Sequence, residues 1–94
     1  MQLFTNGGNV PANQRTDWLT ITHPVTGKEV RAHCFISYGT MIVAVTDEAT
    51  YLDEYYWDYS ATTGRYRNQF LGEGIADTRK GIKAGAYKLA DLNR

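Results

Sequence analysis

The residues between Tyr51 and Leu71 constrain the fold of this chain more than any other stretch. They include five of its seven tyrosines, together with Trp57 and Phe70. Aromatic side chains bury more area per residue than other types, so a small domain has to pack around a group of this size. With 94 residues, the chain has room for one core. We therefore predict a single domain over residues 1–94, organised around this aromatic stretch.

Patterns of side-chain type predict most of the strands. Residues 17–23 alternate and are rich in β-branched and aromatic types, and residues 28–37 follow after a glycine-containing turn, so the two runs predict a hairpin. Residues 41–46 form a nearly continuous apolar run, which is typical of a central strand covered on both faces. Aromatic enrichment favours a strand over a helix for residues 51–59, and alternation predicts one more strand over residues 86–92.

Capping residues mark the first of two predicted helices. Ser60 or Thr62 is suited to its N-cap, because a hydroxyl oxygen can accept a hydrogen bond from an amide of the first turn. The helix then extends to about Leu71, and a left-handed Gly72 ends it. Tyr66 lies on the side predicted to be buried.

A second short helix is predicted to begin at Asp77, as its N-cap, and to end at Gly85. The order of strands, two helices and a last strand predicts an α+β domain. Its sheet is expected to be antiparallel, with about 4–6 strands, and to carry both helices on one face. Residues 1–16 are polar and rich in turn formers, so we expect them to be mobile, with at most a short edge strand over residues 2–5.

The charges are balanced in total but segregated along the chain, whose net charge is zero. Residues 47–58 carry five acidic side chains and no basic one, whereas residues 59–94 carry seven basic and three acidic side chains. Two solvated faces that attract each other would explain this pattern. A basic face for a polyanion is the functional alternative, although a neutral molecule lacks the field that steers most nucleic-acid-binding proteins.

A hydroxyl and arginine run, Ser-Ala-Thr-Thr-Gly-Arg-Tyr-Arg, stands at the start of the first predicted helix. Free amides, the positive end of the helix dipole and nearby guanidinium groups all favour a phosphate there. The alternative is an ordinary cap with solvated arginines. The candidate residues for binding an anion or a nucleic acid are Ser60, Thr62, Thr63, Arg65, Arg67, Arg79, Lys80 and Lys83.

Exposed members of the aromatic group are candidates for binding a protein partner, because tyrosine, tryptophan and arginine anchor protein interfaces. Stacking on unpaired bases is the alternative, but the acidic side chains among the aromatic residues would repel phosphates. Most members of the group are expected to pack in the core. The candidate partner-binding residues are Asp53, Glu54, Tyr55, Trp57 and Asp58.

Catalysis and metal binding find little support in the sequence. His33 and Cys34 are adjacent, so on a strand they point to opposite faces and cannot form a base and nucleophile pair. One cysteine and two histidines lack the paired spacing of a metal site, and no cofactor motif is present. We therefore expect a non-enzymatic protein without metal or cofactor. With a single cysteine and no apolar leader, a cytoplasmic location is expected.

The segments YGTMIVAV and YYWDYSATTGRYRNQFLG, followed by a lysine-rich turn before LADLN, resemble short proteins carried by bacteriophages and other mobile elements. The recurring pattern of that group is a Tyr-Ser-x-Thr-Thr run before a short helix, matched here by Tyr59, Ser60, Thr62 and Thr63. The resemblance implies an anti-CRISPR-like protein in a bacterial host cell, which binds and blocks a host or defence-system protein or nucleoprotein. The alternative is a nucleic-acid-binding module that contacts phosphates through its arginines and lysines.

Overall fold

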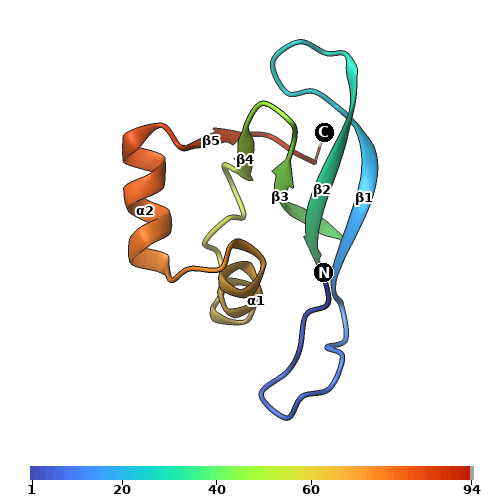
Figure 1. Cartoon of the computed structure of the whole chain (residues 1–94), viewed down its shortest axis with the longest axis vertical. Coiled ribbons are helices and arrows are strands. Elements are labelled where there is room, and N and C mark those ends of the chain that lie inside the picture. The colour runs from blue at the N-terminus through green and yellow to red at the C-terminus, as the bar shows by residue number, and fades with distance from the viewer. Residues whose placement is uncertain (94) are drawn as a thin grey trace.

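The computed structural model describes residues 1–93 and contains a five-stranded sheet with two helices (Figure 1). The elements are β1 (Gln14–Thr22), β2 (Glu29–Ser37), β3 (Thr40–Val45), β4 (Thr50–Asp53), α1 (Ala61–Leu71), α2 (Ile75–Ala84) and β5 (Tyr87–Ala90). The strands lie in the sheet in their order along the chain. The predicted α+β domain, with both helices packed against one face of its sheet, is therefore confirmed.

The predicted antiparallel sheet is wrong at one edge. Strands β1 to β4 are antiparallel neighbours, but β5 is parallel to β4. A tight turn can only join antiparallel strands, and the chain instead leaves β4, passes through α1 and α2, and returns in the same direction. The sheet is therefore mixed.

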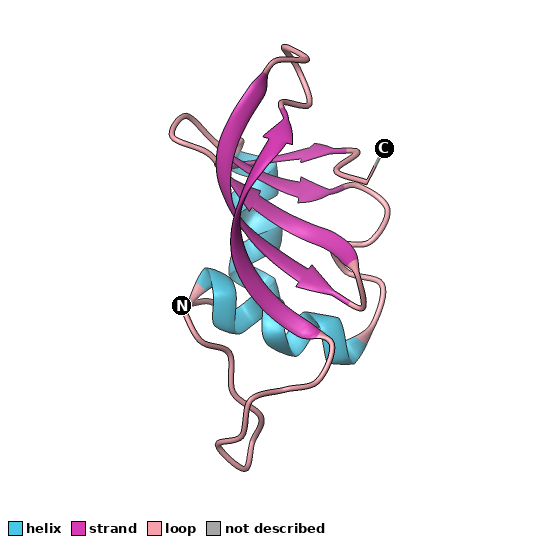
Figure 2. Cartoon of the chain, turned by 90° about the vertical axis from the view of Figure 1, so that its right-hand side faces the viewer, coloured by secondary structure: helices cyan, strands magenta, loops and turns pink. Residues whose placement is uncertain are grey.

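The β1–β2 hairpin and the central position of β3 agree with the sequence prediction, and β1 begins earlier than expected, at Gln14. The register of β2 and β3 shifts beside Phe35 and Ile36, so that Ile42 has no partner on β2. An extra residue of this kind bends a strand and increases its twist. Figure 2 shows the resulting strong curvature of the sheet.

The main core lies between the helices and one face of the sheet (Figure 2). Tyr66, Phe70 and Leu71 of α1 and Ile82 of α2 all pack into it. Its fully enclosed members are Leu3, Phe35, Ile42, Val43, Leu52 and Tyr66. A smaller cluster on the opposite face comprises Ala32, Cys34, Ile36 and Ala44. Both faces of β3 are therefore covered, as its apolar run predicted.

The N-terminal residues form neither helix nor strand, so the edge strand considered for residues 2–5 is absent. They are nevertheless attached to the domain. Leu3 is only 1% exposed and belongs to the main core. The Phe4 amide donates to Oε1 of Gln69 at 3.0 Å, and Nε2 of Gln69 donates to the Phe4 carbonyl at 2.7 Å. These contacts anchor the start of a segment that the sequence predicts as mobile.

Two element boundaries differ from the prediction. The strand expected over residues 51–59 ends at Asp53, whose side chain accepts hydrogen bonds from the next backbone amides and turns the chain. Helix α2 begins at Ile75, with Gly74 as its N-cap, so Asp77 lies in the first turn and is not the cap. No helix within residues 1–93 is long and apolar enough to cross a membrane.

Gly81 is required where α2 packs on β5. A Cβ at this position would lie 2.7 Å from Cδ2 of Tyr87. The ring cannot easily retreat, because its hydroxyl donates to Oε1 of Glu73 at 2.8 Å. Burial, reinforced by this hydrogen bond, raises the pKa of Tyr87 to about 12. The side chain therefore remains a neutral donor to the Glu73 carboxylate throughout the physiological pH range.

We expect Gly81→Ala to lower the free energy of unfolding by about 1–2 kcal/mol in a urea titration, because overpacking outweighs the better helix propensity of alanine. Gly64→Ala in α1 is the matched control, since a Cβ there would lie 3.5 Å from Nη2 of Arg67, an ordinary contact distance. That variant should be as stable as the wild type or slightly more stable. Equal effects of the two substitutions would contradict this account of Gly81.

Candidate functional site

Residues 54–59, which join β4 to α1, form a surface that we call the tyrosine loop. Tyr55, Tyr56 and Tyr59 are 59%, 42% and 48% exposed. The ring centroids of Tyr55 and Tyr56 lie 6.4 Å apart, and those of Tyr56 and Tyr59 lie 5.4 Å apart in an edge-to-face arrangement. The three rings therefore form one continuous aromatic surface.

Asp53 fixes the start of the tyrosine loop from inside the molecule. Its Oδ2 accepts hydrogen bonds from the amides of Tyr55 and Tyr56, at 3.1 and 2.9 Å. Its Oδ1 accepts from the Leu92 amide at 2.9 Å and from Nδ2 of Asn93 at 3.1 Å. The sequence predicted that Asp53 binds a partner. This prediction is wrong, because the residue is fully buried and no surface partner can reach it.

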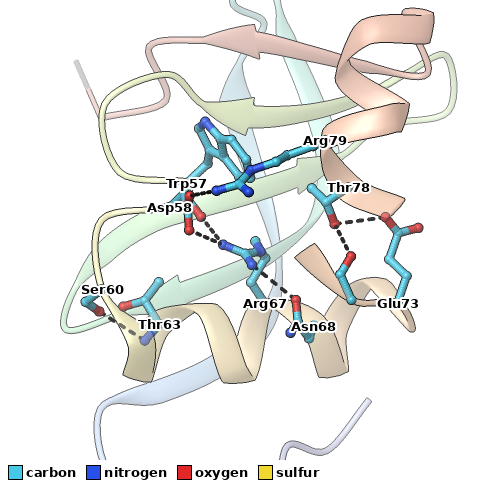
Figure 3. A network of polar contacts seen from close by, with 10 residues as sticks. Trp57, Asp58, Ser60, Thr63, Arg67, Asn68, Glu73, Thr78 and Arg79 are labelled. Carbon is cyan, nitrogen blue, oxygen red and sulfur yellow. Dashed lines mark hydrogen bonds and ion pairs between the residues drawn. The ribbon is translucent and has the colours of Figure 1, made fainter. Parts of the chain in front are cut away.

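Arg67 holds the other half of the loop from below (Figure 3). The side chain is only 1% exposed, and its Nη1 donates to the carbonyl oxygen of Trp57 at 2.6 Å. Its Nη2 donates to Oδ1 of Asn68 at 3.1 Å, and the guanidinium lies 5.3 Å from the centre of the Trp57 ring. Burial lowers the pKa of Arg67, whereas the Asp58 carboxylate opposes this shift.

Trp57 therefore stabilises the loop from inside and contributes little to its outer surface. Its ring is partly buried against the main core. Of the five residues predicted to bind a partner, Glu54, Tyr55 and Asp58 remain exposed, whereas Asp53 and Trp57 face inward. Asp53 is turned inward because it accepts hydrogen bonds from the interior, and Trp57 because its ring packs against the main core and the Arg67 guanidinium.

Asp58 joins the loop to both helices (Figure 3). Its Oδ1 lies 3.5 Å from Nη1 of Arg67 on α1, and its Oδ2 lies 3.2 Å from Nη2 of Arg79 on α2. The Arg79 side chain is 63% exposed and that of Asp58 37%, so water screens their attraction and the pair adds little stability.

A hollow of about 630 Å³ lies beside the loop, between the start of α1 and the start of α2. We call it the arginine groove. Its lining residues are Asp58, Tyr59, Ser60, Ala61, Gly64, Arg65, Arg67, Asn68, Ile75 and Arg79. Three arginines thus face one carboxylate, which gives the groove a positive balance.

The hydroxyl run is divided between the cap and the interior. Oγ of Ser60 accepts from the Thr63 amide at 3.1 Å, which confirms Ser60 as the N-cap of α1. Thr63 is fully buried, and its hydroxyl lies 2.8 Å from that of Ser37. Thr62 is exposed. The expected set of three anion-binding hydroxyls is therefore not formed at one place.

The predicted basic side chains also separate. Arg65 and Arg79 are exposed and line the groove, whereas Arg67 is interior. Lys80 and Lys83 are exposed on α2 and do not line the groove. The structure thus retains two accessible arginines from the expected anion-binding set at the groove.

Tyr56 and Tyr59, the two remaining tyrosines of the loop, were not among the residues predicted to bind a partner. The predicted strand over residues 51–59 would place successive side chains on opposite faces of the sheet. This alternation ends at Asp53, where the chain turns. An aspartate just before a turn, able to accept from amides two and three residues ahead, was the signal that could have revealed the loop.

Cys34 is fully buried in the sheet, whereas His33 is only partly buried. The His33 ring stacks on Trp18 with a centroid distance of 4.8 Å and also contacts Phe70, and burial lowers its pKa. Burial raises the pKa of the Cys34 thiol to about 11, so it is protonated at neutral pH and a poor nucleophile. Within residues 1–93, no three histidine, cysteine or acidic side chains are grouped as metal ligands.

A profile with the description "Family of unknown function (DUF8033)" matches residues 3–86 of the chain. This range contains Leu3, the tyrosine loop, the arginine groove and both helices. No curated protein matches the chain, and no solved structure does.

Proposed function

The chain belongs to DUF8033, a family of unknown function, and we propose that it is a non-enzymatic protein that binds and blocks a host or defence-system protein or nucleoprotein. The observation that carries this proposal is the tyrosine loop. Three exposed tyrosine rings contact one another on a segment whose backbone is held by two buried residues, Asp53 and Arg67.

This arrangement has the physical properties of a binding surface. Tyrosine offers a large contact area at a low cost in side-chain entropy, because its ring has only two rotatable bonds. A loop that is already ordered loses less freedom on association, which increases affinity for a given set of contacts. Hydrogen bonds to Asp53 and Arg67 supply that order before any partner arrives.

The charges of the loop indicate the chemistry of the partner. Glu54 is exposed beside the rings, and Asp58 is about one-third exposed. Aromatic faces and carboxylates together favour arginine and lysine side chains. We therefore propose a basic protein surface as the target, such as one that itself holds a nucleic acid. An anti-CRISPR-like role in the cytoplasm of a bacterial host, which the sequence resemblance implies, would place the protein on such a surface.

We expect combined substitution of Tyr55, Tyr56 and Tyr59 by serine to weaken partner binding at least about 100-fold, since anchoring aromatic residues contribute most of the energy of an interface. Tyr38→Asn is the matched control, because Tyr38 is 58% exposed on the β2–β3 turn and has a φ of 51°, which asparagine tolerates. The tagged protein would first capture a stoichiometric partner from host lysate. Calorimetry with that purified partner would then compare the variants.

Two outcomes would count against this function. One is capture of no stoichiometric protein by the wild type. The other is a captured partner that binds the triple variant as tightly as it binds the wild type and Tyr38→Asn. Glu54→Lys provides a further check. Reversal of this charge should lower the affinity for a basic partner several-fold at low salt, and by less at high salt.

Nucleic-acid binding through the whole basic set is the alternative, and the geometry supports it less. The exposed members of the set are not gathered in one place, because Lys80 and Lys83 lie outside the groove. The net charge of zero also means that the protein lacks the long-range electrostatic attraction to nucleic acids on which such proteins depend. Arg65 and Arg79 remain in its favour, because both are exposed at one groove.

A further inference from the structure

The arginine groove combines one fixed guanidinium with two movable ones. Arg67 is held by the Trp57 carbonyl, by Asn68 and by contact with the Trp57 ring, so its position is set before a ligand arrives. Arg65 and Arg79 are exposed and can adjust to a ligand. An anion site built this way needs to order only its outer side chains.

The start of α1 adds to the positive potential of the groove. Ser60 and Ala61 line it, and the first turn of the helix carries no acidic side chain to offset the helix dipole. An α-helix cannot satisfy the amides of its own first turn, and the Ser60 hydroxyl accepts only the one of Thr63. Arginine side chains and the start of α1 thus line the same groove.

Asp58 shows where an anion can sit. Its two oxygens contact Arg67 on one helix and Arg79 on the other, so the carboxylate already occupies the point at which the guanidinium groups converge. The contacts of 3.5 and 3.2 Å are longer than the usual charge-assisted hydrogen bond. Asp58 belongs to a surface loop and its side chain is 37% exposed, so it can be replaced by a stronger ligand.

We propose that the arginine groove is a binding site for a phosphate group, which takes the place of the Asp58 carboxylate between Arg67 and Arg79 and also engages Arg65. A phosphate has more charge and more acceptor oxygens than a carboxylate, and it matches the two-pronged geometry of arginine. This site adjoins the tyrosine loop and shares Asp58 and Tyr59 with it, but the inference does not rest on the protein partner proposed for the loop.

Titration with inorganic phosphate at low ionic strength, followed by backbone NMR, tests the site directly. Saturable shifts are expected at the amides of residues 60–64, beyond those caused by sodium chloride at matched ionic strength. Arg65→Gln combined with Arg79→Gln should weaken binding about tenfold or more. Lys28→Gln combined with Lys88→Gln is the matched control, because it removes the same charge away from the groove and should leave binding nearly unchanged.

Asp58→Asn gives the most specific result. Removal of the internal competitor should increase phosphate affinity several-fold, whereas an ordinary loss of structure would decrease it. The proposal is overturned if neither the wild type nor Asp58→Asn shows shifts beyond the chloride control, or if the double arginine variant binds as the wild type does. A parallel titration with a short oligothymidylate identifies the source of the phosphate. Much tighter binding with shifts extending beyond the groove to Tyr56 would assign it to a nucleic-acid backbone, and equal binding per phosphate would assign it to a free phosphate or phosphomonoester.

Discussion

Arg67→Ala is expected to lower the free energy of unfolding by about 3 kcal/mol, which is a large fraction of the stability of a small domain. The substitution leaves the Trp57 carbonyl without its 2.6 Å partner and removes a side chain that is only 1% exposed. An unpaired buried acceptor costs about 1–3 kcal/mol, and the lost packing adds to it. Unfolding in urea, followed by tryptophan fluorescence, measures the change.

Two variants test whether the geometry of Arg67 is responsible. Arg65→Ala removes the same side chain from an exposed position of α1 and should change stability by less than about 0.5 kcal/mol. Arg67→Lys keeps the charge but cannot reach Trp57 and Asn68 from two separate nitrogens, so it should recover only part of the loss. Full stability of Arg67→Lys would show that charge alone suffices and would refute the bonding described above.

Asp53→Asn is expected to have an effect of similar size, again about 3 kcal/mol, although the two side chains have nearly the same shape. Asp53 accepts hydrogen bonds from three backbone amides and one side-chain amide, and it is fully buried. An asparagine has only one acceptor oxygen, so its own NH2 group would face N–H donors of the protein. Urea unfolding measures the stability lost.

The same variant should also release the tyrosine loop. Exchange of the Tyr55 and Tyr56 amide hydrogens should become markedly faster in Asp53→Asn, and affinity for a partner of the loop should fall with it. Asp58→Asn is the control for amide exchange in the same segment, because Asp58 is partly exposed and pairs with the side chains of Arg67 and Arg79 and not with the amides of Tyr55 and Tyr56. Unchanged amide exchange in Asp53→Asn would remove the structural argument for a preformed loop.

Local sequence patterns were sufficient for the parts of the fold that depend on neighbouring residues. The β1–β2 hairpin, the apolar β3 and the Gly72 cap of α1 all follow from the order of residue types, which also gave Ser60 as one of two candidates for the N-cap. Each of them is fixed by hydrogen bonds or packing within a short segment, and local chemistry decides their position.

Features fixed by distant contacts could not be predicted in this way. Asp53 ends β4 because amides from both the loop and residues 92–93 converge on it. Arg67 looked like a solvated helix residue, and only the Trp57 carbonyl and ring, brought over α1 by the turn, explain its burial. The sequence therefore placed the candidate residues in one segment, while their division into supporting and exposed residues required the structure.

The parallel pairing of β5 with β4 has a consequence for the maturation of the protein during translation. The ribosome releases β4 and the tyrosine loop well before residues 87–93, which supply the neighbouring strand and two of the hydrogen bonds to Asp53. Until residues 87–93 dock, Oδ1 of Asp53 lacks its hydrogen-bond donors, and the backbone that carries the exposed rings is less restrained. A nascent chain therefore acquires its aromatic surface in final form only once β5 and residues 92–93 have docked.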